Sequence, residues 1–361
     1  EVNAAQALIA HVVTQQQPLF VTCFTPSGKT RAQALLAEAI AQGKAQVQFL
    51  PLDLPWFVQR RLKQVQPRAV VVMETELWPN FCHAVRAAGV PLILASARLS
   101  ARSLRGYQKP LLRRLIGKTL ACFTHIAAQS TADAARYAAL GAQPAQLGVM
   151  GNLKLDVSAP APLQPPVTTR PYWLAASTHE GEELAALAAH RELLATAPDA
   201  TLVLAPRHPA RFAAVRSLVQ QQGFIVAQRT EKALNAKTDP QVLLLDTLGE
   251  LPRVFAPARL AFIGGSLLPP TAKPMGGHNL WEAVVCATPC LTGPQQANNG
   301  YLYTELETAG AVRTVLDVAE LSKQVNTLWH DATARVTMQQ AAQQLAQKNH
   351  GALAYLLPLL V

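Results

Sequence analysis

The sequence predicts an α/β protein made of two doubly wound domains, each with a parallel sheet covered by helices on both faces. One observation behind this is that short apolar runs alternate with amphipathic stretches in both halves of the 361-residue chain. Such a βαβα order is typical of parallel sheets. The other is a stretch with five prolines, SAPAPLQPPVTTRP at residues 158–171, which indicates a stiff connector between domains. The predicted boundaries are therefore 1–157, 158–171 and 172–361.

The first half contains six apolar runs that we predict to be strands, separated by stretches with helical periodicity. The predicted strands are Leu19–Thr22, Val47–Leu50, Ala69–Met73, Pro91–Ala95, His125–Gln129 and Gln146–Val149. The predicted helices are Ala4–Val13, Ala32–Gln42, Phe81–Ala88 and Thr131–Leu140.

The second half repeats this alternation, and packing of its last helix on the first domain is left open. The predicted strands are Tyr172–Ala176, Thr201–Ala205, Ile225–Ala227, Val242–Asp246, Leu260–Ile263 and Cys290–Thr292. The predicted helices are Glu180–Thr196, Ala210–Gln222, Trp281–Ala287 and Leu321–Lys348.

The composition narrows the class of protein. Hydrophobic residues make up 50% of the chain and charged residues 15%, which excludes a disordered protein. No window of ~18 uncharged apolar residues occurs, so we predict no membrane-spanning helix. The chain begins at Glu1 rather than Met, and we expect an upstream piece in which a signal or an anchor could lie. The five cysteines form no CxxC pair, and we expect reduced, buried thiols as in a cytosolic protein.

The excess of positive over negative charge is confined to the first half. Up to Asp156 there are 17 Lys and Arg against 7 Asp and Glu, whereas the remaining residues contain 15 of each. No acidic residue lies between Leu77 and Ala132. This asymmetry predicts that the first half faces something anionic, namely nucleic acid, an anionic membrane surface or a phosphorylated substrate.

Four loops of the second half follow predicted strands, and ligands of such sheets bind at the carboxyl ends of the strands. Glycines in these loops allow a ligand to approach the backbone closely. A helix predicted from Asn279 to Cys286 offers N–H groups to a phosphate, and the Glu282 carboxylate can accept sugar hydroxyls. The four loops are Ser177–Glu180, Pro206–Pro209, Gly264–Ser266 and Gly276–Glu282.

Several side chains in these loops suit a phosphorylated ligand. Arg207 is a permanent cation, and Ser177, Thr178 and Ser266 supply hydroxyls. His208 either donates a hydrogen bond to a phosphate or is a spacer before the next helix. A later loop, residues 293–299, either closes over the base or the sugar of a bound nucleotide sugar or is an ordinary polar loop.

Two strand ends of the first half also carry polar groups. The segment Thr25–Lys29 lies between a strand and a helix but lacks the GxxxxGK[ST] spacing, so we do not predict ATP binding. Glu74 and Glu76 stand beside Trp78, and they either orient a sugar acceptor or form salt bridges.

A basic segment follows these carboxylates. Its residues recur at helical spacing, which predicts that they share one face of a helix. Because acids are missing here, an anion-facing surface is favoured, and sparse aromatic residues disfavour nucleic acid. The basic residues are Arg98, Arg102, Arg105 and Lys109, extended by Arg113, Arg114 and Lys118.

Ten motifs in order resemble the Kdo transferases of lipopolysaccharide synthesis (3-deoxy-D-manno-octulosonic acid transferases, glycosyltransferase family 30), over nearly the whole chain. They are EVNAA at Glu1, FTPSGKTRAQ at Phe24, ETELWPN at Glu74, SARLSARS at Ser96, GNLKLD at Gly151, ASTHEGEE at Ala176, APRHPARF at Ala205, GGSL at Gly264, GGHNLWEA at Gly276 and GPQQANN at Gly293. The family has Asn where this chain has Ser96.

The resemblance implies the GT-B architecture, in which two Rossmann-like domains face a cleft. It implies an inverting, metal-independent transfer of Kdo from CMP-Kdo, held by the C-terminal domain, to the lipid A precursor, held by the N-terminal domain. CMP-Kdo carries one phosphate, so no metal, DxD motif or cofactor is required. The resemblance also implies a protein at the cytoplasmic face of the bacterial inner membrane, held by an N-terminal anchor outside this chain.

The resemblance further implies a set of site residues. Glu1 matches the family's presumed base, which can serve if desolvation raises its pKa. The implied donor-binding residues are Ser177, Thr178, Arg207, His208, Gly264, Gly265, Ser266, Gly277, Asn279, Glu282 and Asn298. The implied acceptor-binding residues are Ser27, Gly28, Lys29, Glu74, Glu76, Arg98, Arg102 and Arg105.

Two other functions fit parts of the sequence. One is another GT-B transferase, or an epimerase, that uses a UDP-sugar. The other is a basic protein without catalysis that binds a membrane surface or nucleic acid. Binding of CMP distinguishes these from a Kdo transferase.

Overall fold

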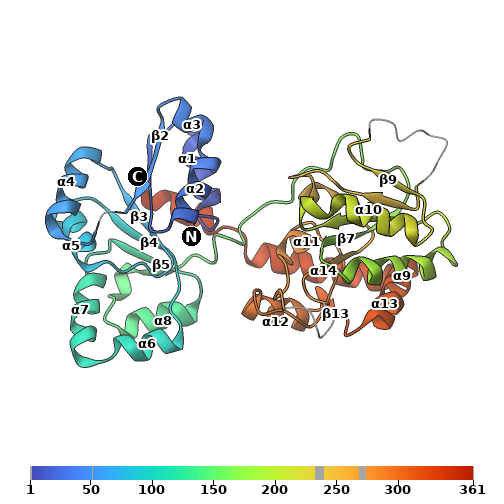
Figure 1. The fold of residues 1–361 in the computed structure, drawn as a ribbon. Helices are drawn as coiled ribbons and strands as arrows, with labels where there is room; N and C mark the ends of the chain where they lie inside the picture. Colours follow the sequence, from blue (N-terminus) through green and yellow to red (C-terminus); the bar gives the residue numbers. More distant parts are fainter. Residues whose placement is uncertain (1, 51, 232–239, 268–273, 361) are drawn as a thin grey trace. The chain divides into compact units, whose positions relative to one another are not determined.

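The computed structural model describes residues 2–50, 52–231, 240–267 and 274–360, and the chain divides into two units (Figure 1). The first unit comprises Glu1–Val157 together with Asn349–Val361, and the second comprises Ser158–Lys348. Each unit is an α/β assembly around parallel strands. The chain therefore enters the second unit once and returns to the first for its last residues.

The strands of the first unit form two parallel sheets. The pair β1 (Leu19–Cys23) and β2 (Ala45–Phe49) makes a two-stranded sheet. The other sheet has the order β3-β4-β5-β6, with β4 buried along its whole length. Its strands are β3 (Val70–Met73), β4 (Leu92–Ala97), β5 (His125–Ala128) and β6 (Leu147–Val149).

The helices of the first unit connect these strands. Among its described α-helices, four begin with proline, whose fixed φ suits the first helical position. The predicted helix Ala32–Gln42 is in fact two helices, which meet at Leu36. The helices are α1 (Gln6–Thr14), α2 (Pro26–Leu35), α3 (Ala37–Ala41), α4 (Pro55–Val65), α5 (Pro79–Ala87), α6 (Ala101–Tyr107), α7 (Pro110–Leu120), α8 (Thr131–Ala139), η1 (Pro144–Gln146), α15 (Ala352–Leu356) and η4 (Leu357–Leu360).

The C-terminal residues are part of the first unit. The buried carboxylate of Asp156 accepts the N–H groups of Gly351 (3.1 Å) and Leu353 (2.6 Å) at the start of α15. Leu356 is fully buried in a cluster with strands β4 and β5 of the first unit. Hydrogen bonds and apolar packing thus both fix this segment.

In its described residues, the second unit has one sheet of seven parallel strands in the order β13-β12-β11-β7-β8-β10-β9. The order reverses at β7, because β8, β10 and β9 lie on one side of it and β11, β12 and β13 on the other. β13 was not predicted from the sequence. The strands are β7 (Tyr172–Thr178), β8 (Thr201–Pro206), β9 (Val226–Gln228), β10 (Val242–Leu244), β11 (Ala261–Ile263), β12 (Cys290–Thr292) and β13 (Val312–Thr314).

Helices α9 and α13 of the second unit lie side by side (Figure 1) and bury a large apolar cluster against the sheet. The predicted helix Leu321–Lys348 is interrupted at Asp331, which takes an extended conformation and accepts the N–H of Ala334 (2.8 Å). The helices are α9 (Glu182–Leu194), η2 (Pro209–Arg211), α10 (Phe212–Gln221), η3 (Leu251–Val254), α11 (Trp281–Val285), α12 (Gly300–Thr308), α13 (Val318–His330) and α14 (Ala332–Lys348).

The proline-rich segment 158–171 packs on the second unit. Arg253 of η3 donates to the carbonyl oxygens of Ala161 (3.0 Å) and Pro162 (3.2 Å), and Leu163 and Val167 are buried. Nowhere in the described ranges is there a helix long and apolar enough to cross a membrane.

Candidate active site

The candidate site of the second unit lies where the strand order reverses. The loop after β7 and the loop after β11 leave neighbouring strands at the same sheet edge, and their connections run to opposite sides. Such a switch point is where open parallel sheets bind ligands. Ser177, the residue before the last of β7, has a positive φ of 55°, which is uncommon for a residue with a side chain. The residues from here to Gly181 therefore turn sharply at the switch point.

A buried carboxylate joins these two loops. Glu182, the first residue of α9, is fully buried. Its Oε2 accepts the N–H groups of His179 (3.0 Å) and Gly265 (2.7 Å), and its Oε1 accepts those of Ser266 (3.0 Å) and Leu267 (2.8 Å). The backbone donors of the loop after β11, which the sequence suggested for a phosphate, are thus already bound by a side chain of the protein. We call this arrangement the Glu182 clamp.

The hydroxyls predicted for the donor are also partly engaged. Ser266 is fully buried, donates to the carbonyl of Ile263 (2.7 Å) and accepts the N–H of Gly293 (2.8 Å). Thr178 is fully buried as well, whereas Ser177 is half-buried. Of the three hydroxyls, that of Ser177 is the one placed to reach a ligand.

The glycines at 276 and 277 are required by contacts within the protein. Both have positive φ, and a Cβ on Gly276 would lie 2.8 Å from the side chain of Asn298. The Asn298 amide donates to the carbonyls of Met275 (2.7 Å) and Gly277 (3.2 Å). Asn299 likewise donates to the carbonyl of His278 (2.9 Å). The loop 293–299 therefore holds the glycine loop in place through its amide side chains.

The helix after this loop is shorter than the sequence indicated. α11 has five residues and begins at Trp281, whose N–H is accepted by Asn279 Oδ1 (3.1 Å). Asn279 also donates to Glu282 Oε1 (3.1 Å). One N–H of this helix start, that of Trp281, is therefore already bound by a side chain. Asn279 also orients the carboxylate of Glu282.

Arg207 is a cation without a protein partner at this edge. It follows β8, is exposed, and forms no ion pair or hydrogen bond through its guanidinium within the ranges that the structure describes. Its neighbour in the same loop region, Arg211, is by contrast paired with the buried Glu183 at 2.5 and 3.3 Å. Burial raises the pKa of Glu282, while Asn279 and the positive charge of Arg207 lower it. The positive charge of Arg207 thus favours the charged form of the Glu282 carboxylate.

Two histidines that the sequence analysis did not single out meet at the switch point. His179 Nε2 lies 2.7 Å from His278 Nε2, and the two rings are nearly parallel, with an angle of 10° between their planes and centroids 5.0 Å apart. The ring of His208, exposed in the loop after β8, stands edge-on to His179 at 5.4 Å. A Cβ on Gly265 would lie 2.8 Å from the His278 ring, so glycine is needed there. We call His179 and His278 the histidine pair.

The predicted groups of the first unit have local partners at their strand ends. Thr25 caps α2 by accepting the N–H of Gly28 (3.1 Å), which removes that N–H from a ligand. Lys29 Nζ lies 4.4 Å from the centroid of the Phe49 ring. Ser27 is exposed, with its hydroxyl 3.3 Å from that of Thr25. The resemblance to a phosphate loop is therefore limited to its sequence.

The carboxylates after β3 are held by neighbouring side chains. Glu74 has a positive φ of 58° and forms an ion pair with Lys154 (2.8 Å). Glu76 accepts the indole N–H of Trp78 (2.7 Å). Ser96, also at positive φ, is buried and accepts the N–H of Leu153 (3.0 Å). Glu74 therefore forms a salt bridge, one of the two roles expected for these carboxylates, and Glu76 is held by a hydrogen bond.

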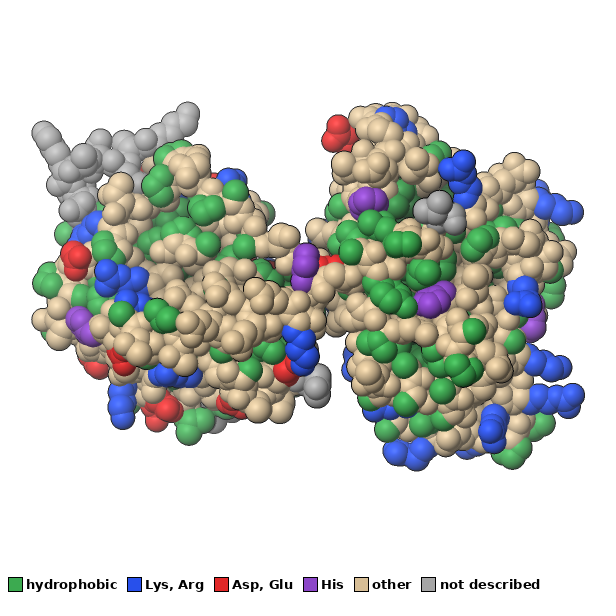
Figure 2. All heavy atoms as spheres, turned by 180° about the vertical axis from the view of Figure 1, so that it is seen from behind, with side chains coloured by type: hydrophobic (Ala, Val, Ile, Leu, Met, Phe, Trp, Pro, Cys, Tyr) green, Lys and Arg blue, Asp and Glu red, His purple; other side chains and the backbone are tan. Residues whose placement is uncertain are grey.

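The basic segment does not form one helix, which corrects the prediction of a shared face. Arg98 precedes α6, whose N-cap is Ser100, and α6 ends before Pro110 begins α7. Arg98, Arg102 and Arg105 are exposed. Figure 2 shows Lys and Arg side chains on the visible face of the first unit with few acidic side chains among them. The basic surface therefore comes from two helices and the turn before them.

Glu1 lies outside the described residues, so its proposed role rests on the sequence alone. Within the described ranges, no group of three or more His, Cys, Asp or Glu side chains could hold a metal ion.

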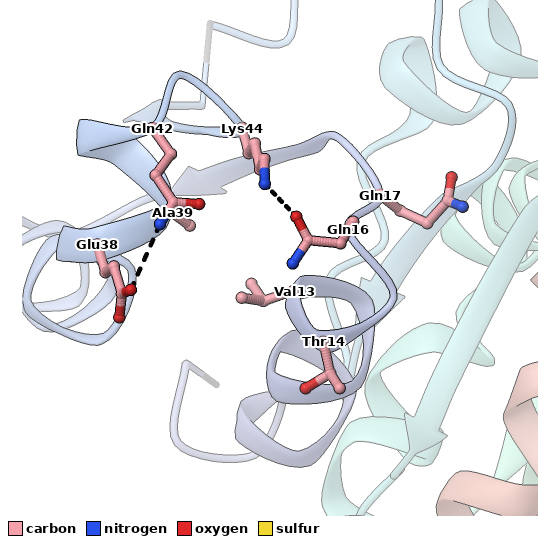
Figure 3. A pocket seen from close by; sticks show the side chains of 8 residues that line it. All are labelled: Val13, Thr14, Gln16, Gln17, Glu38, Ala39, Gln42 and Lys44. Atoms are coloured by element: carbon pink, nitrogen blue, oxygen red, sulfur yellow. Dashed lines mark hydrogen bonds between the residues drawn. The ribbon is translucent and has the colours of Figure 1, made fainter.

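A small polar pocket in the first unit lies away from these groups (Figure 3). It has a volume of about 180 Å³ and is lined by residues of α1, α3 and the segments that precede β1 and β2. Lys44 donates to Gln16 across it, and Gln42 to Glu38 (3.3 Å). Because Gln17 and Lys44 precede the strands, the pocket lies at the amino ends of β1 and β2, opposite the edge used by parallel sheets for ligands.

Comparison with known proteins gives consistent matches. A family model described as 3-deoxy-D-manno-octulosonic-acid transferase (kdotransferase) matches residues 1–157. The 3-deoxy-D-manno-octulosonic acid transferase of Haemophilus influenzae is 34% identical, covering 100% of this chain and 84% of that protein. The enzyme of the same name from Bordetella pertussis is 37% identical, covering 88% of this chain and 76% of that protein.

Among solved structures, the UDP-GlcNAc 2-epimerase from Neisseria meningitidis bound to UDP-GlcNAc resembles the whole chain. The TM-score is 0.60 at 13% identity, with 100% of this chain and 96% of that chain covered. At this identity the likeness concerns the fold alone, which is α/β and GT-B-like.

Proposed function

Because this chain belongs to the 3-deoxy-D-manno-octulosonic acid (Kdo) transferase family, we propose that it transfers Kdo with inversion from CMP-Kdo to the lipid A precursor lipid IVA. Kdo transferases are glycosyltransferases, so the chain is an enzyme of that class. The choice of CMP-Kdo and lipid IVA, the inversion and the residue roles are the proposal.

The observation that carries the proposal is the guanidinium of Arg207, which has no partner among the described residues and whose charge acts on Glu282, at the switch point of the second unit. A nucleoside monophosphate sugar presents one negative charge next to a ribose with two hydroxyls. Arg207 suits the phosphate, because a guanidinium forms charge-assisted hydrogen bonds with phosphate oxygens. Glu282 suits the ribose, since its carboxylate is oriented by Asn279 and can accept two hydroxyls. We therefore assign the donor to this edge, with Ser177 and His208 as further contacts.

The acceptor is assigned to the first unit. A single base is enough for inversion, and we propose Glu1 for it, on the strength of the motif that begins at this residue. The base takes the proton of the acceptor hydroxyl as this oxygen attacks the anomeric carbon of Kdo. Arg98, Arg102, Arg105 and Lys29 face the acceptor phosphates or an anionic bilayer in this proposal. The protein then works at the cytoplasmic face of the bacterial inner membrane.

One assay tests the proposal directly. The protein is incubated with CMP-Kdo and tetraacylated lipid A precursor, and the product masses are read. We expect a mass gain of one or more Kdo residues that requires both substrates and persists in EDTA. No gain with CMP-Kdo, or a gain with a UDP-sugar instead, would overturn the assignment of the donor. Activity that EDTA abolishes and Mg²⁺ restores would overturn the metal-independent mechanism.

A further inference from the structure

We propose that the histidine pair is the proton source for the leaving group: it gains one proton when the donor phosphate binds and gives it to the phosphate oxygen that Kdo leaves. This inference rests on the proposed CMP-Kdo donor. It assigns a role to His179 and His278, which the sequence motifs left without one.

The geometry of the pair limits where protons can be. The two Nε2 atoms are 2.7 Å apart, so one of them carries a proton and the other accepts it. Neither Nδ1 has a hydrogen-bond partner in the described part of the chain. His179 is buried and His278 is half-buried. The Nδ1 atoms are thus the positions at which the pair exchanges protons, and that of His278 belongs to the more accessible ring.

Counting protons shows that the pair holds one charge and no more. In the neutral pair, the ring that donates through Nε2 has a bare Nδ1, and the other ring has a protonated Nδ1. One added proton fills the bare Nδ1, so that both Nδ1 atoms become donors while the shared hydrogen bond persists. A second added proton would have to enter the 2.7 Å contact and break it. The pair therefore behaves as a single titrating unit.

The surroundings keep the pair neutral until an anion arrives. Burial lowers the pKa of His278 to about 4, assisted by the charges of His179, Arg207 and His208. Burial also lowers the pKa of His179, and Arg211 acts in the same direction, while Glu182 opposes it. A phosphate bound at Arg207 offsets the positive charges that disfavour protonation. Its arrival therefore raises the pKa of the pair, and a proton is taken up from solvent.

The chemistry of transfer needs a proton at this place. The acceptor oxygen forms a bond to the anomeric carbon of Kdo as the bond from that carbon to the phosphate oxygen breaks. The electron pair of the broken bond stays on that oxygen, which gains negative charge. The proton on Nδ1 of His278 moves to it, and the pair returns to its neutral state. A proton from His179 Nε2 can shift across the shared hydrogen bond, so both rings take part.

The first test counts protons. Calorimetry of CMP binding is carried out in buffers of different ionisation enthalpy at about pH 7.5, above the second pKa of a phosphate monoester, about 6. We expect the native protein to take up about one proton more than His278→Gln or His179→Gln. His330→Gln, an exposed histidine of α13 in the same unit, is the matched control and should behave as the native protein. Equal proton numbers in all four proteins would overturn the proposal.

The second test uses the pH dependence of turnover. If the pair must be protonated in the donor complex, kcat falls as pH rises above the pKa of the pair. His278→Gln should lower kcat by about 10²-fold and remove this alkaline limb, whereas the KM for acceptor stays the same. Retention of the same alkaline limb in His278→Gln would contradict the proposal.

Because His278 packs on Gly265, the variants could lose structure, so a third measurement uses the native protein. The ring ¹⁵N shifts of the histidines are recorded with and without CMP. One imidazolium that appears on CMP binding supports the proposal, and unchanged neutral rings contradict it. If CMP does not bind the native protein at all, the proposed donor fails. If CMP binds without proton uptake, only the role of the histidine pair fails.

Discussion

The two units present their candidate groups in opposite ways. In the second unit, the loops at the switch point are tied to one another by the Glu182 clamp and by the amides of Asn298 and Asn299. In the first unit, Arg98, Arg102 and Arg105 are exposed on α6 and the turn before it. The difference indicates a site formed before its ligand binds in the second unit. In the first unit it indicates a charged surface whose arginine side chains have no partner among the described residues. Substitutions in the second unit should therefore act by disturbing the structure of the site, and those in the first unit by changing the surface charge.

The largest effect is expected at the Glu182 clamp. Glu182→Ala leaves four backbone N–H groups without an acceptor, each at a cost of ~1–3 kcal/mol where buried. We expect the free energy of unfolding to fall by roughly 4 kcal/mol and CMP binding to be lost. Denaturation in urea and calorimetry with CMP measure the two effects. Glu180→Ala, an exposed acid two residues earlier, is the control; if both variants behave alike, the loops are not held by this carboxylate.

Glu1 provides the strongest expected effect in the first unit. If Glu1 is the base, Glu1→Gln should lower turnover by about 10²–10⁴-fold and leave CMP affinity unchanged. The alternative is that Glu1 only complements the dipole of α1, a contribution of ~0.3–1 kcal/mol to stability. Near-normal turnover with a slightly lower melting temperature would select this alternative. The base would then be sought at Glu74 or Glu76.

The donor contacts should show an intermediate effect. Arg207→Ala and Glu282→Ala each remove charge-assisted hydrogen bonds, and CMP binding should weaken by about 1–3 kcal/mol. Arg102→Ala, in the first unit, should leave CMP affinity as it is. Unchanged affinity in both donor variants would move the donor away from this edge.

The smallest effect is expected at the basic surface. Charge reversal at Arg102 and Arg105 should weaken binding to anionic liposomes, since each basic residue near such a surface contributes ~1 kcal/mol. The loss should shrink at high salt because the charges are screened. CMP affinity should not change. Equal liposome binding by native and reversed proteins at low salt would leave these arginines without a role at the membrane.

The alternation of strands and helices was visible in the sequence because it depends on local periodicity. β13 was missed, since its three residues, Val312, Arg313 and Thr314, do not form an apolar run. The breaks at Pro110 and Asp331 leave a local signal, as proline favours the first helical position and aspartate caps a helix start. Our prediction nevertheless gave more weight to the helical spacing of the arginines than to the proline. It also continued the helix Leu321–Lys348 through Asp331, because the apolar residues on both sides keep a helical spacing.

The site was predictable only as a set of loops. Arg207 and Glu282 could be proposed because their side chains suit a phosphorylated ligand by themselves. The contact of His179 with His278 could not be predicted, since the two residues are 99 positions apart and meet only after β7 and β11 pair. The Glu182 clamp was hidden for the same reason. Glycines that suggested close approach of a ligand instead accommodate His278 and Asn298.

The return of the chain to the first unit bears on how the protein folds during synthesis. Domains made on the ribosome commonly fold in order from the N-terminus. Here the core of the first unit includes Leu356, and Asp156 finds its backbone partners at Gly351 and Leu353. These residues emerge only after the whole of Ser158–Lys348. The second unit can therefore complete its core first, and the unit that is translated first is the last to complete its core.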